Sequence, residues 1–117
     1  MHWTDIHTRH RGAVTVIELR GHLTLGDDDR RLMPEVSRWL DAGHREFLLN
    51  LEHLSYVDSM GIGEMVGVYT RVRKLGGNVK LCHVSPRVQE ILIATRLDDV
   101  LESFGSEDDA VARMTQR

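Results

Sequence analysis

The sequence lacks the features of secreted and membrane-embedded proteins. It contains one cysteine, Cys82, so an internal disulfide framework is excluded, as is typical of proteins in a reducing cytoplasm. Its first residues are polar and lack the apolar core of a signal peptide. No apolar run approaches the roughly 20 residues that cross a bilayer. We therefore expect a cytoplasmic domain without membrane insertion.

The sequence also lacks a concentration of positive charge. Its 15 lysines and arginines are spread among 18 aspartates and glutamates, giving a net charge of −3. Nucleic-acid-binding proteins gather basic residues in a patch or stripe, and that electrostatic footprint is absent. We expect no direct contact with nucleic acid. A chain of 117 residues is long enough for one domain and too short for two.

The motifs of common catalytic and cofactor sites are missing as well. Gly61-x-Gly63 lacks the third glycine of the dinucleotide fingerprint, and no phosphate-binding G-K-[S/T] motif occurs. Ser59 is not in the G-x-S-x-G context of a hydrolase nucleophile. His7 and His10, if they lie on a strand, point to opposite faces and make a poor metal pair. We expect no catalytic residue, no metal and no cofactor; a binding module fits better than an enzyme.

What the sequence does contain is an alternation of strand and helix patterns. Runs rich in β-branched and apolar residues predict strands, and apolar residues at i, i+3, i+4 and i+7 predict helices. Strands are predicted at 3–10, 13–19, 46–51 and 78–84. Helices are predicted at 27–40, at 62–75, from Pro86 to Thr95 and after Ser106. Residues 97–104 are predicted to form either a short strand or an irregular apolar segment packed inward.

This order predicts an α/β fold with a mixed, mostly parallel central sheet flanked by about four helices. The first two strands can pair as a hairpin, and Gly21 is expected to end the second of them. Asp27, Asp28 and Asp29 are expected to open the next helix. Pro34 leaves two alternatives: the helix proper begins near Leu32, or Pro34 bends it.

The rest of the chain is organised around the turn between the strand at 46–51 and the helix at 62–75. Asp58 and Ser59 lie in this turn, at a helix N-terminus, where unpaired N–H groups and a partial positive charge favour an anion. Either residue can also be a simple N-cap, and the local pattern does not decide between these readings. Gly61 and Gly63 leave the start of the helix nearly bare, so that a partner or ligand can approach closely.

The segment 49–63, which contains Asp58-Ser59-Met60-Gly61-Ile62-Gly63, resembles the STAS domain of anti-sigma factor antagonists. That family carries a D-S-[small]-G-[LI]-G pattern at this place. The segments 21–23, 76–81 and 85–88 also resemble the family, and the similarity spans about residues 13–112. The resemblance implies a single STAS-like domain over residues 1–117.

The resemblance also implies a partner-switching function. In the family, the serine after the aspartate is phosphorylated by a serine-protein kinase that is itself the anti-sigma factor, and Ser59 occupies that position. The unphosphorylated antagonist binds the kinase, the phosphorylated form is released, and a PP2C-type phosphatase resets it. A cytoplasmic monomer or weak dimer is expected. The expected partner-binding residues are Thr24, Asp58, Met60, Gly61, Ile62, Gly63, Glu64 and Gly67.

Two departures from the family pattern leave other functions open. Thr24 stands where the family often has aspartate, and Met60 replaces a small residue. Neither removes the hydroxyl of Ser59. The alternatives are a stressosome-like STAS scaffold subunit and an accessory subunit of an ABC-type lipid transporter, in which Ser59 need not be phosphorylated.

Overall fold

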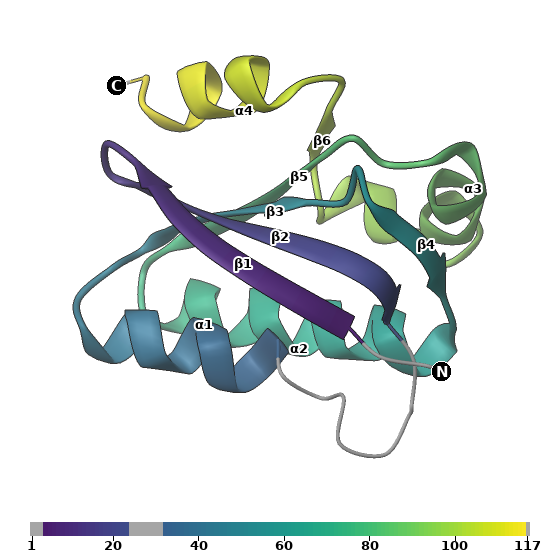
Figure 1. Ribbon diagram of the computed structural model, residues 1–117, viewed down its shortest axis with the longest axis horizontal. Coiled ribbons are helices and arrows are strands. Elements are labelled where there is room, and N and C mark those ends of the chain that lie inside the picture. Colours follow the sequence, from purple (N-terminus) through teal and green to yellow (C-terminus); the bar gives the residue numbers. More distant parts are fainter. Residues whose placement is uncertain (1–3, 24–31, 117) are drawn as a thin grey trace.

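The computed structural model describes residues 4–23 and 32–116, which form a six-stranded sheet with helices on both faces (Figure 1). None of the helices in these two ranges is long and apolar enough to cross a membrane. In chain order the elements are β1 (Thr4–Arg11), β2 (Val14–Leu23), α1 (Leu32–Asp41), β3 (Glu46–Asn50), β4 (Leu54–Val57), α2 (Ser59–Lys74), β5 (Asn78–Cys82), α3 (Pro86–Ala94), the 3-10 turn η1 (Leu97–Asp99), β6 (Ser103–Phe104) and α4 (Glu107–Met114).

The sheet is mixed and mostly parallel, as the sequence predicts. Its strand order is β1-β2-β3-β5-β6, and β4 pairs with the last residues of β2. β1 and β2 form an antiparallel hairpin, whereas every other pairing is parallel. Crossover helices therefore connect β2 to β3, the β3–β4 segment to β5, and β5 to β6.

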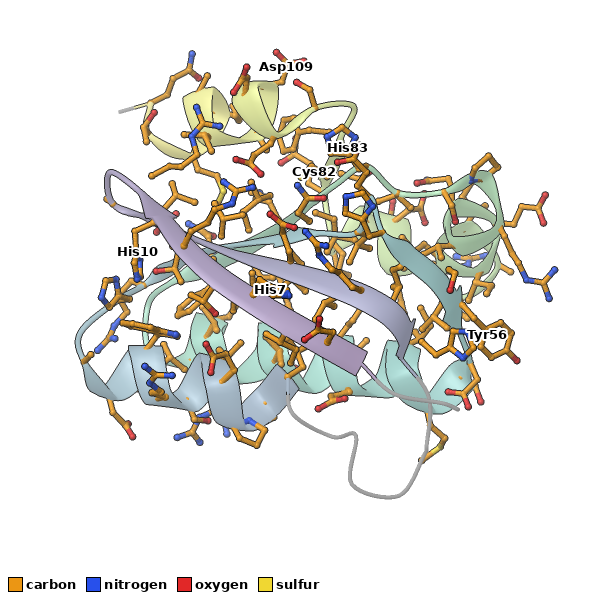
Figure 2. The ribbon with its side chains drawn as sticks, in the orientation of Figure 1. His7, His10, Tyr56, Cys82, His83 and Asp109 are labelled. Atoms are coloured by element: carbon orange, nitrogen blue, oxygen red, sulfur yellow. The ribbon has the colours of Figure 1, made fainter. Side chains whose placement is uncertain are left out.

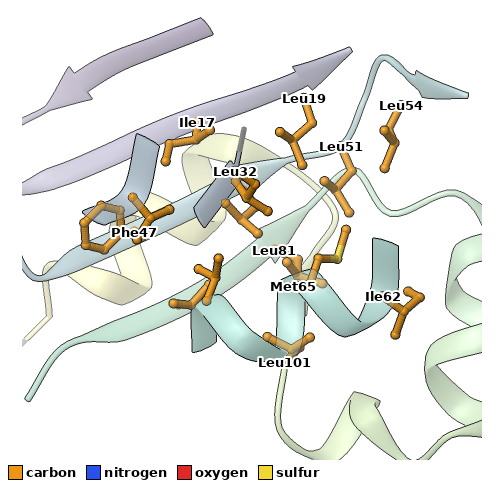
Figure 3. Packing of buried hydrophobic residues seen from close by; sticks show 14 of the residues in the cluster. Ile17, Leu19, Leu32, Phe47, Leu51, Leu54, Ile62, Met65, Leu81 and Leu101 are labelled. Atoms are coloured by element: carbon orange, nitrogen blue, oxygen red, sulfur yellow. The ribbon is translucent and has the colours of Figure 1, made fainter. Parts of the chain in front are cut away.

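Helices α1, α2 and α3 cover one face of the sheet, and α4 covers the other (Figure 1). The larger core lies on the three-helix face, where Phe47, Met65 and Leu81 are fully buried (Figure 3). A smaller cluster under α4 contains Cys82 and Ala110. Burial raises the pKa of the Cys82 thiol to about 12, so this cysteine is a small neutral core residue.

Two predictions about the strands need correction. Gly21 does not end the second strand: β2 continues to Leu23, and Gly21 has a φ of 87° at an irregularity in the pairing. Its N–H donates to the carbonyl of His53 and its carbonyl accepts from the Ser55 hydroxyl, so the strand bends without stopping. The second correction is β4, which the sequence analysis missed. The turn at Asp58 therefore follows β4 and not β3.

The helix predictions also need correction at particular residues. α1 begins at Leu32, so Pro34 lies in the first turn, where its missing N–H costs no intrahelical bond. The expected acidic opening at residues 27–29 lies outside the described residues. On α2 the buried residues are Gly61, Ile62, Met65, Val68 and Val72. Leu75, the last residue of the helix predicted at 62–75, is 48% exposed because the helix ends at Lys74.

An ion-pair network fastens α4 to the sheet. The two terminal guanidinium nitrogens of Arg9, Nη1 and Nη2, donate to the carboxylate of Glu107, at 2.6 and 2.5 Å. Arg11 donates to the same carboxylate at 3.1 Å, and the amide of Asn50 donates at 2.9 Å. The hydrogen bonds from Arg9, with further help from Asn50 and Arg11, lower the pKa of Glu107 to about 2.

This network predicts a specific loss of stability in acid. A carboxylate with a depressed folded-state pKa stabilises the fold above its ordinary pKa, and that stability is lost as pH falls through the folded value. Between about pH 4.5 and pH 2, wild-type protein should lose about 2 kcal/mol more than Glu107→Gln. Urea unfolding at several pH values measures this difference. Asp108→Asn is the control, because Arg11 also contacts this carboxylate but it is 86% exposed. The expectation would be contradicted if the free energy of unfolding fell with pH equally steeply in wild type and in Glu107→Gln.

Candidate functional site

The turn between β4 and α2 is built by Asp58. Its backbone is extended, with φ −105° and ψ −177°, and its Oδ1 accepts a hydrogen bond from the N–H of Gly61 at 2.8 Å. Its carbonyl accepts the first intrahelical bond, from Ile62, at 3.0 Å. Asp58 is therefore the N-cap of α2, and Ser59 is the first residue of the helix.

Only some of the residues that the sequence analysis expects to bind a partner are exposed at this turn. Ser59 and Gly63 are exposed, and Met60 is 48% exposed. A Cβ placed on Gly63 would meet nothing within 4 Å, so this side of the helix start is open to a neighbour. Gly61 and Ile62 are buried. Ile62, although expected among the partner-binding residues, packs its side chain in the core (Figure 3).

Glu64 and Gly67 lie on the side of α2 that faces α1. Oε2 of Glu64 accepts a hydrogen bond from the backbone N–H of Met33 at 3.2 Å. A Cβ at Gly67 would lie 3.4 Å from Cε of the Met33 side chain. The structure thus places both residues at a contact between two helices. Thr24, the remaining residue expected at the site, lies outside the described residues.

The sequence analysis did not select Tyr56 as a site residue, although it lies two residues before Asp58. It is 42% exposed, and its ring meets the ring of His22 edge-on, with centroids 5.7 Å apart. Figure 2 shows Tyr56 at the end of the molecule where β4 leads into α2. Within β4 only Leu54 and Val57 are buried. This pattern does not follow strict strand alternation, and β4 itself was not predicted, so the sequence carried no clear signal for an exposed Tyr56.

The electrostatics of the turn favour added negative charge on Ser59. α2 is 16 residues long and has no acidic residue within its first turn. The partial positive charge of its N-terminus is offset by the Asp58 cap alone among the residues of the turn. A helix end of this kind is suited to a phosphate group, whose oxygens accept hydrogen bonds from backbone N–H groups.

The cap itself can be tested through stability. Asp58→Ala should destabilise the domain by about 1 kcal/mol, because the Gly61 N–H loses its side-chain acceptor. Asp58→Asn keeps an acceptor oxygen at the same position, so it should lower the free energy of unfolding clearly less than Asp58→Ala does. Chemical denaturation of both variants gives the comparison. If the alanine variant unfolded at the same midpoint as wild type, the assignment of Asp58 as the cap would be wrong.

Residues 4–23 and 32–116 contain no group of three or more histidine, cysteine, aspartate or glutamate side chains placed to hold a metal ion.

Comparison with known families identifies the fold: a model of the STAS domain matches residues 5–110. The chain belongs to the STAS domain family. The turn that begins α2 is thus a feature of a STAS domain, and Ser59 is its exposed serine.

Individual proteins are also similar to this chain in sequence or in structure. The chain is 27% identical over 112 residues to an anti-sigma F factor antagonist from Paenibacillus polymyxa, with 94% of each chain covered. A putative anti-sigma factor antagonist from Thermotoga maritima superimposes with a TM-score of 0.85 at 18% identity, over 95% of both chains. The Bacillus cell fate determinant SpoIIAA, in its phosphorylated form, gives a TM-score of 0.73 at 21% identity, over 93% of this chain and 98% of its own.

Proposed function

We propose that this STAS domain is an anti-sigma factor antagonist whose binding to an anti-sigma factor is controlled by phosphorylation of Ser59. The observation that carries the proposal is the position of Ser59, an exposed hydroxyl on the first residue of α2 with the capping task done by Asp58. The family assignment and the relative from Paenibacillus polymyxa support the antagonist function.

The chemistry of the switch follows from this position. Phosphorylation adds a charge of roughly −1.5 to −2 and three acceptor oxygens to Ser59. The positive end of α2 accommodates that charge, so the domain stays folded. At an interface that closes over Met60 and Gly63, the same charge is costly to desolvate and repels nearby carboxylates. The phosphorylated chain is therefore released while its own fold is unchanged.

The partners follow from the same scheme. The chain is the substrate and ligand of an anti-sigma factor that is also a serine-protein kinase, and a PP2C-type phosphatase returns Ser59 to the hydroxyl form. The antagonist acts in the cytoplasm as a monomer or weak dimer. A stressosome-like scaffold would instead assemble into large particles, so sedimentation at working concentration separates the two functions. Co-purification with a membrane ATPase would favour the transporter alternative.

The proposal is tested by complex formation with candidate switch kinases from the source organism. With ADP present, the chain and its kinase should co-elute from a size-exclusion column. After incubation with ATP the complex should dissociate, and treatment with a PP2C-type phosphatase should restore it. A complex that survives complete phosphorylation of the chain would show that phosphorylation is not the release signal.

A further inference from the structure

Met33, in the first turn of α1, is held by a residue of another helix. The first N–H groups of a helix have no partner within that helix. The N–H of Met33 donates to Oε2 of Glu64, which belongs to α2. A carboxylate at this end of a helix is favoured by the helix dipole and by the hydrogen bond together. Glu64 therefore acts as a cap for α1 from the helix that carries Ser59.

Gly67 lies next to the Met33 side chain. It follows Glu64 by three residues, so the two lie on the same side of α2. Cε of Met33 lies 3.4 Å from the position that a Cβ on Gly67 would take, an ordinary van der Waals distance, so the Met33 side chain lies beside Gly67 on the surface of α2. The neighbouring Leu32 is fully buried and fixes the same turn of α1 to the core (Figure 3). One hydrogen bond and one ordinary packing contact thus join the first turn of α1 to α2.

This contact joins two exposed parts of the surface. Ser59 is exposed at the start of α2, and Pro34 is exposed in the first turn of α1. We propose that Glu64 is a positioning residue: its carboxylate holds the first turn of α1 against the phosphoacceptor helix, and the partner kinase binds both as one preformed surface. This inference rests on the proposed function. A preformed surface loses less conformational freedom on binding than one that must be ordered, and so binds more tightly.

The test combines two measurements on the full chain. In the free protein, Glu64→Ala should raise the hydrogen-exchange rate of the Met33 amide roughly fivefold to tenfold, as expected for loss of a helix cap. With the kinase, the same variant should raise KM for the chain by a similar factor and leave kcat within about twofold, because Glu64 lies more than one helical turn along α2 from Ser59. Glu64→Gln, which keeps an acceptor oxygen, should largely rescue both values.

A control separates positioning from loss of stability. Val16→Ala removes buried volume under α4, on the opposite face of the sheet from α1 and α2, and should leave KM unchanged. Unchanged exchange of the Met33 amide in Glu64→Ala would overturn the inference. So would an unchanged KM, or a rise in KM that Val16→Ala reproduces. If no switch kinase phosphorylated the wild-type chain, the proposed function and the kinase-binding step would fail together, whereas the Met33 exchange would still decide whether Glu64 caps α1.

Discussion

Gly77→Ala should destabilise the domain by about 3 kcal/mol or more, the largest effect that we expect from removing or adding a single methyl group. A Cβ at this position would lie 2.2 Å from the carbonyl oxygen of Arg45 and 2.7 Å from a methyl group of Val72. The Arg45 carbonyl also accepts the N–H of Asn78, where β5 begins beside β3. The backbone cannot yield here without loss of the first contact between these strands.

Gly76→Ala is the matched control. Gly76 has a φ of 87°, which strains any other residue, but a Cβ there would meet nothing within 4 Å. Its replacement should cost only about 1–2 kcal/mol, the usual penalty for a left-handed conformation. Urea denaturation of the two variants compares a steric clash with backbone strain at neighbouring positions. If both variants were destabilised equally, the close approach of residue 77 to Arg45 would contribute nothing to the loss of stability.

Ser59→Asp should weaken binding to the partner kinase by at least about tenfold, whereas Ser59→Ala should bind like wild type. The aspartate introduces a charge into a contact that must exclude water, and the alanine removes only a hydroxyl. The same aspartate lies at the positive end of α2 and should leave the domain as stable as wild type or slightly more stable. Calorimetric titration gives the affinity, and thermal unfolding gives the stability.

The loss of kinase affinity should depend on where along α2 the negative charge is introduced. Thr70→Asp places the same charge on an exposed residue of α2, about three turns from Ser59, and should leave kinase affinity within about twofold of wild type. Equal loss of affinity in Ser59→Asp and Thr70→Asp would indicate a general electrostatic effect. Unchanged affinity in Ser59→Asp would contradict a switch at this turn.

The fold and the exposed serine were predictable because their signals are local. Apolar periodicity located every major helix, and the hairpin and the mixed sheet followed from the element order. β4 was not predictable in this way. It has four residues, too few for a periodic pattern, and it forms by pairing with the end of β2, about 30 residues earlier in the chain.

The position of the helix start at the candidate site was predictable because its signal is also local. Asp58 and Ser59 lie at a helix start that the sequence marks clearly, and the structure assigns the cap to Asp58. Glu64 and Gly67 were among the residues expected to contact a partner. Their contact with Met33 crosses more than 30 residues of chain, and no pattern within α2 indicates it. The partner-binding roles of the residues around Ser59 stay predictions.

The most direct test of the switch is intact-mass analysis after incubation with ATP and candidate switch kinases from the source organism. The account predicts the gain of one phosphoryl group in the wild-type chain and no gain in Ser59→Ala. The exposed hydroxyl at the start of α2 would then be the phosphoacceptor. If a kinase that binds the chain added no phosphoryl group, or added one equally to Ser59→Ala, the central claim would be contradicted, and Ser59 would be only the first residue of a helix.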